Sequence, residues 1–95
     1  MLCARATLTA GPRHRRYPKG TLVRAVIFAK VDSVDQLQDK SLLGLAKRGW
    51  RRLRIDGHAR MEDDHVFPAP ESAEATAFRA ALDTGLSIIV VGRVQ

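Results

Sequence analysis

The sequence is poor in cysteine, in aromatic residues and in long apolar runs. Cys3 is its one cysteine, so no disulfide can form within the chain and no second thiol is present for a zinc knuckle or a CxxC redox pair. No apolar run approaches the roughly 18 residues that cross a bilayer, and the first residues lack the apolar stretch of a signal peptide. These absences predict a cytoplasmic protein that does not associate with membranes.

Recognisable catalytic and nucleotide-binding motifs are also missing. Four glycines, Gly11, Gly20, Gly85 and Gly92, are too scattered to form a phosphate-cradling loop. The order of residues suggests no Ser-His-Asp or Cys-His pairing, and no base is signalled near Cys3. We therefore identify no catalytic residue and no cofactor, which disfavours a conventional enzyme.

Acidic residues are absent from the first third of the chain. Seven of the 16 Lys and Arg residues lie in residues 1–30, which contain no Asp or Glu, whereas residues 31–95 are close to neutral. A basic segment of this kind suits contact with nucleic-acid phosphates, or it can simply keep the protein in solution. The preference for Arg over Lys also fits a GC-rich coding sequence with no role in binding.

The length of the chain suits one small domain. At 95 residues it falls below the usual size of two domains. A domain of this size buries only about 60–65% of the surface that its unfolded chain exposes. Burial against a second copy would add stability, so we expect a homo-oligomer.

Alternating apolar residues predict the first strands. Residues 2–10 alternate as a short strand, and residues 11–20 form a loop rich in Gly, Pro and Arg. Residues 21–31 are the clearest strand and are apolar on both faces, as expected in the middle of a sheet. Ser33 and Gln36 have the spacing of a capping box and predict a helix that ends near Gly49.

The second half of the chain predicts a hairpin, a helix and a last strand. Asp56-Gly57 is a strong signal for a two-residue turn between strands 50–55 and 58–62. A helix over 71–84 and a strand over 86–94 follow. From residue 21 the order is β-α-β-β-α-β, an α+β, ferredoxin-like sandwich with both helices on one sheet face. We therefore divide the chain into an extra N-terminal strand with a basic loop, 1–20, and a single ferredoxin-like domain, 21–95.

The predicted sheet carries an apolar patch on the face opposite the helices. In the ferredoxin-like arrangement the first and last strands are neighbours, which places Val26 and Phe28 beside Ile89 and Val91. Monomers rarely leave such patches exposed. A second sheet or the strand 2–10 could cover this one. The leading hypothesis is therefore a binding or interaction module, homo-oligomeric through this face, whose ligand is a small molecule or a protein.

A second hypothesis is a nucleic-acid-binding accessory protein. Basic residues of the loop and of strand 50–55, with one aromatic ring, would contact phosphates and bases; they are Arg13, Arg15, Arg16, Lys19, Arg52, Arg54 and Trp50. The element order is also that of the RRM, but residues 57–61 lack the aromatic signature of its third strand. At a helix-strand junction, Trp50 also fits a residue at the edge of the core.

Two histidines and several carboxylates gather in residues 56–65. His58, Asp63, Asp64 and His65 carry side chains that zinc, iron or manganese ligate. Their spacing matches no metal motif, and Asp, His and Gly are common in turns for conformational reasons. We expect no metal, and these residues remain the site of a third hypothesis, a small enzyme of the dimeric α+β barrel type without a sequence motif.

Overall fold

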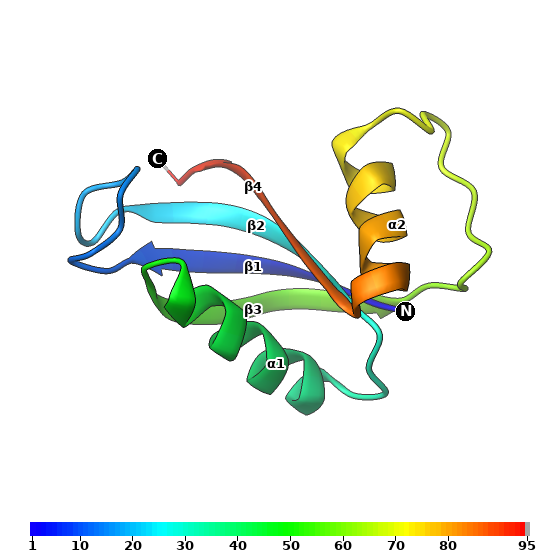
Figure 1. Cartoon of the computed structure of the whole chain (residues 1–95), viewed down its shortest axis with the longest axis horizontal. Helices are drawn as coiled ribbons and strands as arrows, with labels where there is room; N and C mark the ends of the chain where they lie inside the picture. The colour runs from blue at the N-terminus through cyan, green and yellow to red at the C-terminus, as the bar shows by residue number, and fades with distance from the viewer. Residues whose placement is uncertain (95) are drawn as a thin grey trace.

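Four antiparallel strands form one open sheet in the order β3-β1-β2-β4. The computed structural model describes residues 1–94. Along the chain (Figure 1) the elements are β1 (Leu2–Ala10), β2 (Leu22–Ala29), α1 (Val34–Lys47), β3 (Trp50–Arg60), α2 (Ala73–Thr84) and β4 (Leu86–Arg93). The predicted α+β class is confirmed, whereas the predicted ferredoxin-like order is wrong. Over residues 1–94, no helix is long and apolar enough to span a membrane.

The N-terminal strand β1 lies inside the sheet, so it does not cover the predicted apolar patch. It pairs with β2 on one side and with β3 on the other. The place that the prediction gave to a return strand over 58–62 is therefore taken by β1. The physical reason is burial, because one face of β1 consists of small or apolar side chains that an inner strand removes from water; Leu2, Ala4, Ala6, Leu8 and Ala10 are all buried.

The Asp56-Gly57 pair does not turn the chain, so the predicted hairpin is wrong. β3 continues through it as one strand of 11 residues. Its register against β1 shifts at this point, since Arg5 faces Gly57 and Ala6 faces Ile55. Asp56 is thus the extra residue of a β-bulge. A two-residue hairpin turn of this type needs positive φ angles, and within residues 1–94 Gly20, Gly49 and Gly85 adopt them, but Gly57 does not.

Helix α1 covers the first face of the sheet. Ser33 Oγ accepts a hydrogen bond from the backbone N–H of Gln36, which confirms the predicted N-terminal cap. The helix is followed by Gly49 at φ +90°, as the C-terminal signal predicted. Leu37 and Leu45 are buried on its inner side. They pack against alternate residues of β1 and β2 to form the larger core cluster.

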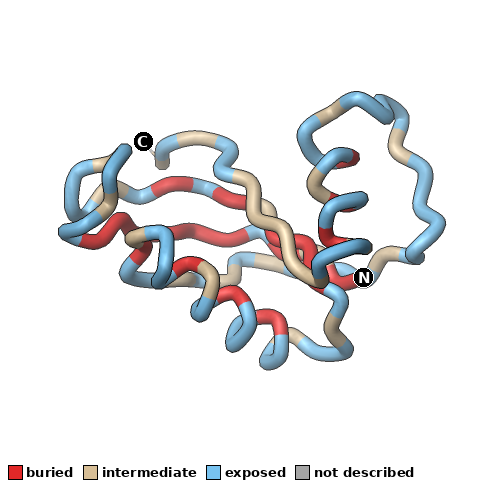
Figure 2. Tube along the Cα trace, viewed as in Figure 1, coloured by how far each residue is buried: buried red, intermediate tan, exposed pale blue. Residues whose placement is uncertain are grey.

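Helix α2 packs against the second face, so the prediction that both helices share one face is wrong. The Phe78 ring meets the Phe28 ring edge to face, with centroids 5.8 Å apart. Ala81 and the half-buried Cys3 belong to the same cluster. The connection from β3 to β4 joins opposite edges of the sheet, and α2 lies along it where apolar side chains of the second face need cover. Figure 2 shows buried positions in both helices and in the central strands.

Candidate functional site

Arginines cluster on the part of the second face that α2 leaves uncovered. Thr7 of β1 is paired with Arg24 of β2 on one side and with Arg54 of β3 on the other. Residues paired across antiparallel strands point to the same face, so the three form a row across the sheet. Arg52 lies beside Thr9 in the next row. We call the exposed set Arg5, Arg24, Arg52 and Arg54 the arginine face.

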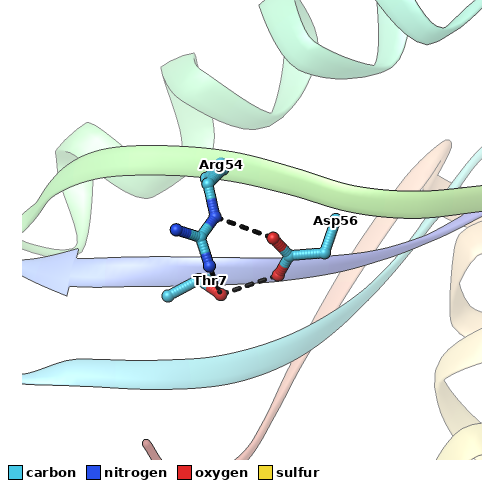
Figure 3. Close-up of polar contacts among 3 residues, drawn as sticks. All are labelled: Thr7, Arg54 and Asp56. Atoms are coloured by element: carbon cyan, nitrogen blue, oxygen red, sulfur yellow. Dashed lines mark hydrogen bonds and ion pairs between the residues drawn. The ribbon is translucent and has the colours of Figure 1, made fainter.

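A hydrogen-bonded network orders the centre of the arginine face (Figure 3). Arg54 Nε donates to Asp56 Oδ1 at 2.7 Å, and the Thr7 hydroxyl donates to Asp56 Oδ2 at 2.7 Å. Arg54 Nη2 also donates to Thr7 Oγ1 at 3.3 Å. The hydrogen bond from Thr7 and then the one from Arg54, with the positive charges of Arg54 and Arg5, lower the pKa of Asp56. The bulge therefore places an ionised carboxylate where it holds Arg54 over the sheet.

Arg5 and Arg24 border a shallow depression of about 490 Å³ on the same face. Val26 and Val91 form its apolar side and Asp56 lies at its rim. The Arg5 guanidinium lies close above Gly57, since a Cβ placed there would come within 2.8 Å of Arg5 Nη2. The depression thus combines two cations and one carboxylate with a small apolar wall, and its two cations suit an anionic group.

The basic loop 11–20 lies beside the first residues of β3. His14 Nδ1 accepts hydrogen bonds from the backbone N–H groups of Arg16 and Tyr17, both at 3.1 Å. The His14 ring packs against Trp50 at a tilt of 59°, with centroids 4.3 Å apart. A second depression, of about 570 Å³, joins this loop to the end of α1. None of its lining residues is acidic, and its basic ones are Arg13, Arg15, Arg16, Lys47 and Arg48.

Trp50 occupies the core-edge position that its place at a helix-strand junction predicts. It is 9% exposed and belongs to the cluster under α1. Its ring lies 5.7 Å from that of Tyr17, over which the Arg93 guanidinium lies. Trp50 therefore packs against His14 and Tyr17 of the basic loop. It presents little surface on which a base could stack.

The four residues of the predicted apolar patch do share the second face, but α2 changes their exposure. Phe28 is 2% exposed because it lies beneath Phe78. Val26 and Ile89 are paired and half-buried, while Val91 is 64% exposed. The open apolar area is smaller than the sequence predicted, and association through it stays a prediction.

The candidate metal ligands do not converge. Asp63 Oδ1 lies 3.3 Å from the amine of Met1, and the His65 ring packs edge-on against Phe67 at 4.7 Å. His58 lies on β3, on the rim of a shallow groove beside the start of α1. For residues 1–94, no group of three or more His, Cys, Asp or Glu side chains is placed to hold a metal ion.

Cys3 is half-buried in the cluster beneath α2. Burial raises the pKa of its thiol, so the reactive thiolate form is disfavoured. The guanidinium groups of the arginine face are able to bind anions.

No family model, no curated protein and no solved structure matches the chain. Sequence reasoning singled out Arg52, Arg54 and the loop cations but missed Arg5 and Arg24. Both stand at polar positions within apolar strands, and only the strand register shows that they share a face with Arg54.

Proposed function

We propose that the protein binds nucleic acid by contacts to the phosphate backbone, made by the arginine face and the basic loop. The observation that carries this proposal is the convergence of Arg5, Arg24 and Arg54 from three neighbouring strands onto one exposed face. Arg52 extends the face toward the end of the sheet where the basic loop begins. Guanidinium groups bind phosphate oxygens through paired hydrogen bonds, which makes arginine the favoured residue for such contacts.

The spacing of these arginines suits successive phosphates. Arg24 and Arg54 flank Thr7 on adjacent strands, so their backbones lie about 10 Å apart. Arg52 and Arg54 are two residues apart on β3, which corresponds to about 7 Å along the strand. Long arginine side chains can adjust these separations to the phosphates of a flexible strand.

Charge is distributed unevenly along the sheet. The basic loop lies at the end of the sheet where β1 finishes (Figure 1). The acidic residues Glu62, Asp63 and Asp64 follow β3 at the opposite end. Such a field would orient an approaching polyanion toward the basic end and raise its association rate.

The proposed binding mode does not depend on base sequence. Phe28 and Trp50 are buried, so they offer no stacking platform of the kind that RNA-binding sheets use. Affinity should therefore come mainly from phosphate contacts and should fall steeply as the salt concentration rises.

A salt titration of binding to a fluorescent single-stranded oligonucleotide tests this proposal. In the Arg24→Ala/Arg54→Ala variant two phosphate contacts are lost, so the slope of log affinity against log salt should become less negative by about 1.4. The matched control is Lys30→Ala/Arg79→Ala, which removes two exposed cations away from the arginine face and should keep the wild-type slope. Failure of the wild type to bind at low salt, or equal slopes for both variants, would reject the proposal.

A small anion is the competing ligand class, because the depression beside Arg5 and Arg24 also has an apolar side formed by Val26 and Val91. Such a ligand would make the protein the small-molecule binding module of the leading sequence hypothesis. Titration with pyrophosphate, followed by amide chemical shifts, separates the two. Saturation at micromolar concentration with shifts confined to this depression favours the small anion, whereas displacement of an oligonucleotide only by high salt favours the polyanion.

A further inference from the structure

The outer side of helix α1 carries an apolar stripe that faces away from the sheet. Leu43 is 72% exposed and Leu42 is 40% exposed. With Ala46 they line a shallow groove along the helix, bounded by Asp39 and Lys47. Spacings of three and four residues place these positions on one side of a helix. No other element of residues 1–94 lines this groove.

Helix α2 shows that such a stripe is not a general property of helices in this chain. Its buried residues, Ala75, Phe78 and Ala81, are turned toward the sheet. The exposed large hydrophobic residues among residues 1–94 include Leu42 and Leu43 of α1 but none from α2. The apolar outer side is therefore specific to α1 and suggests a contact with another molecule.

The stripe is complementary to itself when two helices run antiparallel. Leu43 lies midway between Asp39 and Lys47, which are eight residues apart and so about 12 Å apart along the helix. A twofold axis at Leu43 would place Asp39 of each copy opposite Lys47 of the other. A parallel arrangement would instead oppose like charges, and it would also align the two helix dipoles unfavourably.

We propose that the protein forms a homodimer in which α1 packs antiparallel against α1 of a second copy around Leu43. The contact is isologous, as in most homodimers. Charge supports it beyond the two central pairs, because Asp35 lies in the first turn of α1 and Arg48 is its C-cap. The acidic first turn of one helix would lie near the basic end of the other.

The geometry of this dimer leaves the arginine face open. α1 covers the first face of the sheet, whereas Arg5, Arg24, Arg52 and Arg54 lie on the second. The two arginine faces would point away from each other, so dimerisation leaves them free to bind anions. The depression beside the basic loop shares Ala46 and Lys47 with the α1 groove, so the dimer would narrow that second site. A single helix-helix contact is smaller than the interfaces of tight complexes, so we expect dissociation in the micromolar range or weaker.

Analytical ultracentrifugation from low micromolar to millimolar concentration tests the proposal. The wild type should shift from monomer to twice that mass, and Leu43→Asp should stay monomeric across the range. Because Leu43 is largely exposed, this variant should keep the wild-type circular dichroism spectrum. The matched control is Val91→Asp, an exposed apolar residue on the second face, which should dimerise like the wild type.

A charge exchange tests the antiparallel register. Asp39→Lys alone and Lys47→Asp alone should each weaken dimerisation about tenfold, because each opposes like charges twice. The double variant, Asp39→Lys/Lys47→Asp, restores opposite charges and should return to the wild-type dissociation constant. A wild type that stays monomeric, a Leu43→Asp variant that still dimerises, loss of the dimer in Val91→Asp, or no recovery in the double variant would each overturn the proposal.

Discussion

The two faces of the sheet are built differently, although the same four strands form both. The first face, under α1, is a continuous apolar surface from Leu2 to Ala10 on β1 and from Val23 to Ala29 on β2. The second face has its apolar cluster at one end, where α2 covers Phe28. Its other end carries the arginines, with Leu22 and Val91 exposed among them. Burying a guanidinium without a partner is costly, so the charged end stays open and the composition of the strands limits how much of the face a helix can cover.

Removing the main contact between α2 and the second face of the sheet should have the largest effect on stability. Phe78→Ala deletes the ring that covers Phe28, and replacing a buried Phe by Ala costs about 3–5 kcal/mol of unfolding free energy. Urea denaturation followed by circular dichroism measures the loss. Val66→Ala, at an exposed position, should change the free energy by less than about 0.5 kcal/mol. Equal stability of the two variants would show that α2 does not depend on this contact.

Adding a side chain at Gly49, at the edge of the first face where the basic loop meets Trp50, should destabilise the protein. This residue has φ +90°, and an added Cβ would lie 2.9 Å from His14 Cα. A left-handed conformation alone costs an L residue roughly 1–2 kcal/mol. Gly49→Ala should therefore lower the unfolding free energy by more than this amount. Gly20→Ala is the control, because Gly20 has φ +87° but open space around it. Equal losses at both positions would contradict the close approach of the loop.

The negative charge of Asp56 should weaken the binding of polyanions to the arginine face. Asp56→Asn removes a negative charge from the rim of the depression beside Arg5 and Arg24. Affinity for a single-stranded oligonucleotide should rise roughly two- to fivefold at low salt and less at high salt. Asp83→Asn, an exposed change on α2, should leave affinity nearly unchanged. If both variants gain equally, net charge and not the arginine face controls binding.

The smallest effect should be the pH dependence that the same network confers. The pKa of Asp56 is lowered in the folded protein, so its contribution to stability is present above the unfolded value of about 3.9. That contribution is lost as the pH falls through the folded pKa. The stability advantage of the wild type over Asp56→Asn should therefore be constant near neutral pH and decrease in strong acid. A difference that grows on acidification would contradict the network.

Local signals predicted most of the secondary structure. The cap at Ser33 and the glycine at position 49 lie where the sequence indicated, and the helix predicted over 71–84 is observed as α2, Ala73–Thr84. The alternation over residues 2–10 and 21–31 also predicted the strands β1 and β2. Capping and periodicity depend on residues within about four positions of one another, so a single sequence contains what is needed to recognise them.

Strand order, by contrast, was decided by partners far apart in the chain. Asp56-Gly57 by itself favours a turn. Because β3 pairs with β1 along its whole length, the chain continues through these two residues and Asp56 forms a bulge instead. The same non-local pairing brings Arg5 and Arg24 beside Arg54, which no spacing in the sequence indicates. Likewise, only the path of the chain from β3 to β4 determines that α2 covers Phe28.

Local signals in the sequence therefore indicate both helices, the ends of α1 and the concentration of positive charge near the N-terminus. Which strands are neighbours, which face each helix covers and which arginines share a surface follow from tertiary packing. The physical reason is that burial of apolar area is non-directional. Several strand orders could bury the same side chains, and the choice among them depends on how the whole chain packs.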